Sequence, residues 1–243
     1  MTRRLKSWKV GLGVIIGLFL SNVPTVQLSA QVGHDPGASP YRDIPLHSGP
    51  AIFFGHLSGD RGSAGAGTSN ATTYGARYEL PAGHVLQFQF TGALLRGDRF
   101  IIDPRADSNS AARRTGPVKS SLGFAEIGMQ LRLTGGKTWH QIAPYVGTGL
   151  GLMFDVSSPG DTTASGYRFG TKFSLALSSG VRWYPARRVT VTADARAQFW
   201  RLKYPVSFHT VEAPDGSRVI PLTQSLTDWT THPWISLGIG WIF

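Results

Sequence analysis

The chain has no cysteine among its 243 residues. Disulfide bonds and thiolate metal sites are therefore excluded. Acidic residues are scarce as well, because 14 Asp and Glu stand against 24 Lys and Arg, and none precedes Asp35. From Pro50 onward the sequence also lacks any helical pattern of useful length. We therefore expect a fold that is held together by strand pairing and packing alone.

The first 30 residues have the pattern of a secretory signal peptide. They open with four basic residues: Arg3, Arg4, Lys6 and Lys9. An apolar stretch follows at Val10–Leu20, and a small residue, Ala30, stands at the expected cleavage point. The apolar stretch is shorter than the about 20 residues that span a bilayer as a helix. We expect export with cleavage near residue 30, and a retained membrane anchor is the alternative.

Cleavage would remove four positive charges and no negative one, which lowers the formal net charge from +10 to +6. A surplus so modest and so scattered does not indicate nucleic acid binding. Residues 31–49 are rich in Pro, Gly and polar residues, so we expect a flexible periplasmic leader there. The remaining residues, 50–243, have the length of one domain.

Within that domain, apolar residues alternate with small or polar ones in eight segments. In the last segment, WISLGIGWIF (234–243), every second residue is bulky and apolar, and small residues lie between. A period of two indicates a β-strand with one apolar face. The eight segments lie near residues 50–59, 71–80, 85–95, 120–133, 142–154, 168–184, 189–202 and 232–243.

Short and long connections alternate between these segments. The short ones are 81–84, 134–141 and 185–188, and the long ones lie around 60–70, 96–119, 155–167 and 203–231. This alternation is typical of a membrane barrel with tight periplasmic turns and long outer loops. A soluble sandwich or lipocalin-like barrel, with its apolar face inward, is the alternative. We expect an all-β fold, an eight-stranded antiparallel up-and-down transmembrane β-barrel.

Aromatic side chains are expected at the two membrane interfaces of such a barrel. Strands of about ten residues, tilted by about 40°, cover the roughly 25 Å of an outer-membrane apolar band. On this basis we place one girdle near the turn end and one near the loop end. The members are Tyr78, Tyr145, Trp183 and Trp241 for the turn end, and Tyr74, Phe199, Trp200 and Trp234 for the loop end.

The last segment resembles the closing strand of Gram-negative outer-membrane β-barrels. The resemblance rests on Ile235, Leu237, Ile239, Trp241 and Phe243. The stretch APYVGTGLGLMF (143–154) similarly resembles a strand of small barrels of the OmpA/OmpX/OmpW type. The resemblance implies an outer-membrane location with lipid and lipopolysaccharide around the barrel. It also implies that the closing strand is an assembly signal, bound by the barrel assembly machinery after delivery by periplasmic chaperones. No peptidoglycan-binding domain follows the barrel, so a tethering role is not implied.

Eight charged side chains fall on the polar, inward face of the expected strands: Arg77, Glu79, Glu126, Arg132, Lys172, Arg182, Asp194 and Arg196. An eight-stranded barrel is only wide enough for its own side chains. Isolated charges would be costly in so narrow a lumen, so we expect them to pair across it. The glycines at 147, 149 and 151 would leave room for the long arginines opposite. A polar plug is the interpretation we favour, and an ion path or narrow diffusion channel for small solutes is the alternative.

Catalytic and metal-binding patterns are weak. Seven histidines are scattered along the chain, and none stands at a familiar spacing from a nucleophile or from a second ligand on one strand face. His56, His209 and His232 are the ones expected near the outer half of the barrel. We therefore expect no enzymatic activity, no metal and no cofactor. A lipid A-modifying enzyme is the third hypothesis, after the structural barrel and the channel.

The longest basic segment is the expected outer loop at 96–119. Its cations are Arg96, Arg99, Arg105, Arg113, Arg114 and Lys119, against three aspartates. Arginine binds phosphate well through paired donors, so these residues are possible lipopolysaccharide contacts. A solvated loop without a ligand is the alternative. The Arg-Gly-Asp triplet at 96–98 is interpreted as a turn at the end of a strand. The sequence as a whole predicts a non-enzymatic outer-membrane barrel with a structural or surface-interaction role.

Overall fold

The computed structural model describes residues 39–44, 48–157 and 165–243. The fold lies in one compact unit, Pro40–Phe243. The predicted signal peptide and most of the predicted leader lie outside the described residues. Among the described residues, no helix has the length and apolar content that crossing a membrane as a helix requires.

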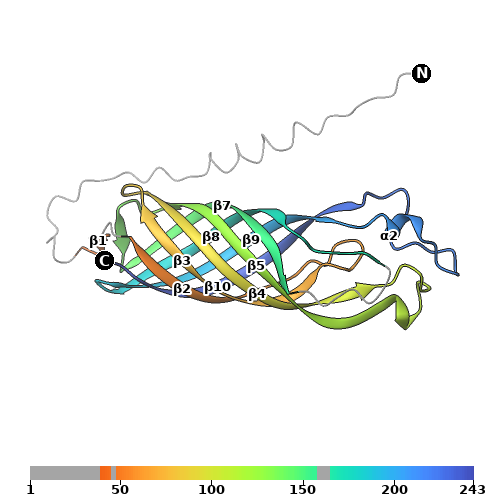
Figure 1. Cartoon of the computed structure of the whole chain (residues 1–243). Coiled ribbons are helices and arrows are strands. Elements are labelled where there is room, and N and C mark those ends of the chain that lie inside the picture. Colours follow the sequence, from red (N-terminus) through yellow and green to blue (C-terminus); the bar gives the residue numbers. More distant parts are fainter. Residues whose placement is uncertain (1–38, 45–47, 158–164) are drawn as a thin grey trace, which may run out of the picture. The chain divides into compact units, whose positions relative to one another are not determined.

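Eight long antiparallel strands form a closed barrel in the described part of the chain (Figure 1). They are β2 (Gly49–Leu57), β3 (Thr68–Pro81), β4 (Leu86–Ile102), β5 (Arg114–Arg132), β7 (Ile142–Ser157), β8 (Lys172–Ala186), β9 (Val189–Lys203) and β10 (Thr227–Trp241). Neighbours in sequence are neighbours in the sheet, and β10 pairs with β2 to close it. The prediction of an eight-stranded up-and-down barrel is confirmed.

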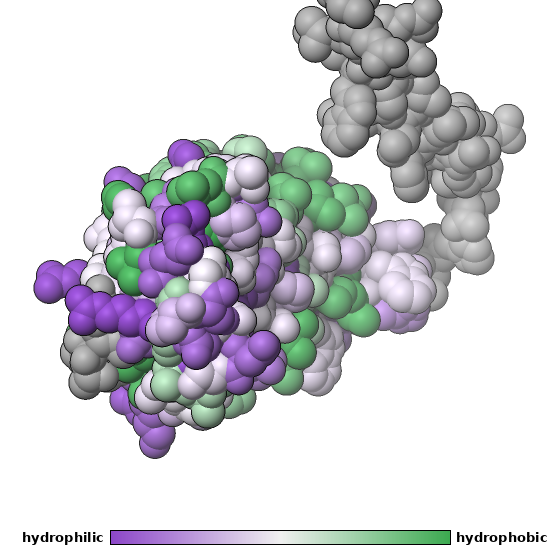
Figure 2. All heavy atoms as spheres, turned by 90° about the vertical axis from the view of Figure 1, so that its right-hand side faces the viewer, coloured by the Kyte–Doolittle hydropathy of each residue, from purple (hydrophilic) through white to green (hydrophobic). Residues whose placement is uncertain are grey.

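The turn end and the loop end differ as the connection lengths predict. Short turns join β3 to β4, β5 to β7 and β8 to β9 at one end, and longer connections lie at the other. A 3-10 turn, η2 (Ala111–Arg113), and one helical turn, α2 (Ser207–Thr210), are found in those longer connections. In Figure 2, which faces the loop end, hydrophilic side chains gather over this surface.

The predicted loop at 96–119 is shorter than expected. β4 and β5 continue to pair beyond the apolar belt, with Asp98 opposite Lys119 and Ile102 opposite Arg114. The Arg-Gly-Asp triplet at 96–98 therefore lies inside β4, and its interpretation as a strand-end turn was wrong. Alternation of apolar residues stops where the strands leave the membrane, which is why the sequence pattern missed this extension.

The predicted leader also contains ordered structure. Residues of β1 (Tyr41–Asp43) pair with β6 (Lys137–Trp139), a short strand in the turn between β5 and β7. Ile44 follows β1, is 4 % exposed, and donates its N–H to the carbonyl of Gly136. The turn offers unpaired backbone groups, and the leader satisfies them. Residues 41–44 are therefore part of the barrel's turn end and not a loose segment.

The two faces of the barrel wall have opposite character. Large apolar side chains such as Ile52, Phe54, Ile127 and Leu237 are more than half exposed on the outside. The inward positions of the same strands hold buried polar residues, among them Gln89, Thr91 and Glu126. A soluble barrel would have its apolar face inside, whereas lipid requires it outside. This arrangement is that of a transmembrane barrel.

Candidate functional site in the lumen and at the outer rim

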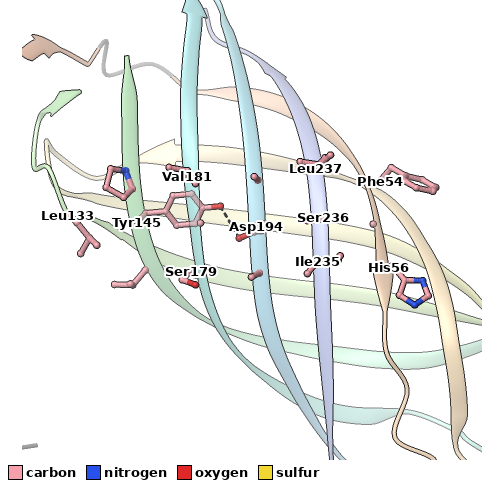
Figure 3. Close-up of a pocket in the computed structure, with 16 residues that line it drawn as sticks. Phe54, His56, Leu133, Tyr145, Ser179, Val181, Asp194, Ile235, Ser236 and Leu237 are labelled. Carbon is pink, nitrogen blue, oxygen red and sulfur yellow. Dashed lines mark hydrogen bonds between the residues drawn. The ribbon is translucent and has the colours of Figure 1, made fainter. Parts of the chain in front are cut away.

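An ion-pair network fills the half of the lumen nearer the turn end. The Asp194 carboxylate, whose side chain is fully buried, accepts from Arg77 at 2.9 Å and from Arg196 at 3.2 Å. The Tyr145 hydroxyl donates to the same carboxylate at 2.8 Å (Figure 3). Arg196 extends the network to Glu126 at 2.8 Å. Side chains from β3, β5, β7 and β9 are thus joined in one network, in which Asp194 contacts Arg77, Arg196 and Tyr145, and Arg196 contacts Glu126.

A second group of contacts lies beside the first. Arg182 forms an ion pair with Glu79 at 2.6 Å and donates to the Gln87 side-chain oxygen at 2.7 Å. Arg132 donates to the same oxygen, also at 2.7 Å. Gln130 accepts from Arg182 at 3.2 Å. The amide side chains thus bring Arg132, for which no ion pair is found in the described ranges, into contact with the charged groups.

Six of the eight predicted lumen charges are joined by these ion pairs: Arg77, Glu79, Glu126, Arg182, Asp194 and Arg196. Lys172 is different. It is half-buried at the start of β8, and its ammonium lies 5.7 Å from the centre of the Phe169 ring. It takes part in none of the ion pairs found within the described residues, because it sits above the carboxylates, near the loop end.

Glycines on β7 and β8 create the space for this network. A Cβ on Gly149 would lie 2.5 Å from the carboxyl carbon of Glu126, and one on Gly180 would lie 2.5 Å from the Tyr145 hydroxyl. The sequence interpretation assigned the β7 glycines to arginines opposite. The structure corrects this, because the side chain seated on Gly149 is a glutamate.

Apolar and aromatic side chains fill the outer half of the lumen. The cluster includes Phe53, Phe124, Tyr167, Phe169, Trp200, Tyr204, Phe208 and Trp234. Trp234 is 1 % exposed and lies between Phe53 and Phe124, with ring centres 5.9 and 5.5 Å away. Charged groups near the turn end and aromatic rings near the loop end thus occupy different halves of the lumen.

This outer cluster corrects part of the predicted aromatic girdles. Trp200, Trp234 and Tyr145 are buried inside the barrel and do not face lipid. Each has the parity of the inward residues on its strand, for example Trp200 beside Gln198. Tyr78, Trp183 and Trp241 do point outward, each more than 40 % exposed near the turn end.

A buried histidine fastens the first outer loop over the lumen. The ring of His232 stacks on Trp200 with centres 3.4 Å apart. Its Nδ1 accepts from the backbone N–H of Asp60 at 3.0 Å, and its Nε2 lies 2.8 Å from the Thr230 hydroxyl. Asp228 holds the same loop through the N–H of Ser63 at 2.8 Å. This His–Thr contact is sealed from lipid and from solvent, so its role is to position the loop.

Two other outer loops are joined at their tips. The exposed carboxylate of Asp215 accepts from the hydroxyls and N–H groups of Ser217 and Ser108. These bonds, the Ser217 hydroxyl first, hold the pKa of Asp215 well below its usual range. Asp107 in turn accepts from the N–H of Asp215 at 3.0 Å. The connection between β4 and β5 is thus tied to the one between β9 and β10.

The predicted lipopolysaccharide contacts lie in four different environments. Arg99 is 5 % exposed and faces inward over Tyr167, so burial removes it from the set. Arg113 is half-buried and donates to the carbonyl of Ala106 at 2.6 Å, which ties it to its own loop. Arg105 and Arg114 are exposed near the loop tips, whereas Arg96 and Lys119 point outward from the strands.

Four of the five residues of the predicted assembly signal share one face of β10, and Phe243 lies two residues beyond the end of that strand. Their side chains are 47 to 72 % exposed on the outer surface: Ile235, Leu237, Ile239, Trp241 and Phe243. β10 itself pairs with β9 along its whole length and with β2 over Trp234–Gly240. In the described ranges, no group of three or more His, Asp or Glu could hold a metal ion.

The comparisons with known proteins concern the fold. No protein-family model matches the sequence, and no curated protein matches it either. The outer membrane protein OprG from Pseudomonas aeruginosa is 14 % identical with a TM-score of 0.53, over 83 % of this chain and 99 % of that one. The N-terminal barrel domain of P. aeruginosa OprF (14 %, TM-score 0.42, 83 % and 100 %) and Neisserial surface protein A (13 %, 0.44, 84 % and 98 %) are further matches. At such identities, the likeness to OprG shows the barrel fold and leaves the role to be argued from the site.

Proposed function

We propose that this chain is an integral outer-membrane barrel with a structural or surface-interaction role, whose lumen does not conduct. The observation that carries the proposal is that both halves of the lumen are occupied, one by the ion pairs around Asp194 and the other by the rings around Trp234. A water-filled path would have to break a buried network and displace a packed aromatic cluster at the same time. The apolar outer belt and the fold shared with OprG support the outer-membrane location.

Planar-bilayer recording on the refolded full chain tests the closed lumen. We expect no stepwise conductance above that of the empty bilayer. The matched variant removes the outer closure with Trp200→Ala and Trp234→Ala together, and we expect at most brief, small openings because the ion pairs remain. Steady single-channel steps from the unmodified protein would support the narrow diffusion channel instead.

The outer-membrane location is tested separately from the closed lumen. We propose that the outward face of β10 is bound during assembly and that the exported chain fractionates with the outer membrane. Sucrose-gradient fractionation of expressing cells should place it there, and recovery with the inner membrane would contradict the location.

We also propose that the barrel has no catalytic role. Of the three outer histidines, His209 lies in the helical turn α2. His232 is buried against Trp200, and His56 faces Thr72 across the strand pair. None of these arrangements supplies a nucleophile with a positioned base and acid among the described residues. Lipid A isolated from expressing cells should keep its mass, and a loss or gain of one acyl group would establish the enzyme hypothesis.

A further inference from the structure

A polar hollow lies on the outer face of the wall, near the loop ends of β2 to β5. Its volume is about 520 Å³. The side chains and backbone that line it are His56, Asn70, Thr72, Arg96, Gly97, Asp98, Lys119, Ser120 and Ser121. Outward positions lower on the same strands are apolar, among them Phe54 and Leu94. The hollow therefore sits at the border between the lipid belt and the polar rim.

Strand register brings its key side chains into two adjacent rows. His56 is opposite Thr72, and Thr72 is opposite Arg96. The next row toward the loops pairs Asp98 with Lys119. Directly opposed residues share a face and lie about 5 Å apart, so these groups converge although they come from four strands.

The two cations of the hollow, Arg96 and Lys119, form no ion pair within the described residues. The Arg96 guanidinium lies 5.3 Å from the centre of the Tyr74 ring, which holds it at the upper edge of the belt. Asp98 is the one carboxylate against two cations among the residues that line the hollow. Such a site, next to lipid, favours an anion that brings several acceptor oxygens.

An apolar groove begins where the hollow ends. Its volume is about 830 Å³, and His56 lines both. Small outward residues, Ala193, Ala195 and Ser179, form its base on β9 and β8, and Ile235 and Leu237 border it on β10 (Figure 3). The groove thus crosses β2, β10, β9, β8 and β7, in that order round the barrel.

The groove descends from the rim toward the turn end. Its row of paired residues is His56, Ile235, Ala195, Ser179, Val146 and Leu131. In the other direction the row passes from His56 through Thr72 and Arg96 to Ser121. Both ends of the circuit are on β5, and Ser121 lies ten residues nearer the loop end than Leu131. At about 3.3 Å per residue, the full circuit rises by roughly 33 Å along the strand.

We propose that the hollow and the groove together bind one phosphorylated, acylated lipid of the outer leaflet. The proposed ligand is lipid A. The phosphate contacts Arg96 and Lys119, with Thr72 and His56 as further polar neighbours. One acyl chain descends from His56 over Ala195 and Ala193. The proposal rests on the proposed outer-membrane location, since only the outer leaflet offers such a lipid at that height.

Native mass spectrometry and fluorescence titration on the refolded chain in detergent test the site directly. The probes are bisphosphorylated lipid A, the same lipid without phosphates, and inorganic phosphate. We expect one tightly bound lipid A, much weaker binding of the dephosphorylated lipid, and no measurable binding of phosphate alone. Arg96→Ala and Lys119→Ala should each weaken lipid A binding about tenfold or more, the usual effect of losing a charge-assisted hydrogen bond. Arg96→Lys should recover part of the loss.

Two further variants separate the site from general charge attraction. Ala195→Trp fills the groove on a face that tolerates large apolar side chains, and it should weaken lipid A binding while the barrel still folds. Arg168→Ala removes an exposed cation outside the hollow and outside the predicted contact set, and it should leave binding unchanged. Equal binding of the dephosphorylated lipid, or an equal loss in Arg168→Ala, would overturn the proposal. Conductance is measured independently, so a failure here is distinct from a failure of the closed lumen.

Discussion

Removing the Asp194 carboxylate should destabilise the barrel more than any change at an exposed ion pair. Asp194→Ala takes away the acceptor of Arg77, Arg196 and Tyr145 at once. Arg196 keeps Glu126, but Arg77 keeps only uncharged neighbours, the Ser236 hydroxyl at 3.4 Å and the Phe53 ring with its centre 4.5 Å away. The variant therefore leaves one guanidinium buried with almost nothing to balance its charge.

The expected size follows from that geometry. Breaking a buried pair by deleting one partner costs about 3–5 kcal/mol, because the remaining charge is stranded. Unfolded protein should thus become between about a hundredfold and several thousandfold more populated. The pair of Glu212 and Arg218 offers a matched control at 2.5 Å, with side chains 51 % and 32 % exposed. Glu212→Ala should cost about 0–1 kcal/mol, as exposed pairs do.

Urea unfolding of both variants in lipid vesicles, followed by tryptophan fluorescence, measures the two free energies. The dependence on urea should keep its slope, since the same surface is exposed on unfolding. An Arg77→Ala, Asp194→Ala double variant should regain part of the loss, because neither charge is then left alone. If Asp194→Ala fell within 1 kcal/mol of the unmodified barrel, the network would not be the buried, paired structure described above.

Three further predictions concern packing, assembly and topology. Gly149→Ala should lower the free energy of unfolding by about 1–3 kcal/mol, because the new Cβ crowds Glu126, whereas Gly92→Ala, which meets no atom within 4 Å, should be nearly neutral in the same urea titration. Phe243→Ala should still refold as a compact, heat-modifiable band, with a cost on the order of 1–3 kcal/mol, yet reach the outer membrane poorly in cells; normal cellular levels would leave the closing strand a structural role only. Trypsin applied to intact cells should cut after Arg218 in an outer loop and never after Arg187 in a turn. Mass spectrometry identifies the fragments, and a cut after Arg187 would indicate an inverted barrel.

Sequence reasoning predicts the barrel because its signals are local. A period of two and alternating connection lengths are properties of neighbouring residues, and both survive into the structure. The extensions of β4 and β5 were missed because apolar and polar residues do not alternate at 96–102 or at 114–119. The order in residues 41–44 was missed because it depends on a turn distant in sequence, at 137–139.

The sequence predicts which charged side chains face the lumen, but it does not predict which of them form ion pairs with one another. Parity places Arg77, Glu126 and Asp194 inside, but which of them meet depends on the stagger of the closed sheet. Parity would also have placed Trp200 and Trp234 inside, and a prediction based on height in the membrane overrode it. The polar partners Gln87 and Gln130 share the inward face and carry no charge, so a search for charges passed over them.

Because β10 pairs with β2, the sheet is closed and has no edge strand, so the barrel does not require that the chain begin at β2. At the turn end, the N–H of Phe243 lies 3.4 Å from the carbonyl of Ser48, so a few added residues could join the two ends covalently. New ends could then be opened at the tip between β4 and β5, around residues 105–110. Such a circularly permuted chain would lose the β1–β6 pair but keep every pair among the eight barrel strands. It would present both new ends at the loop end, where a second protein could be fused.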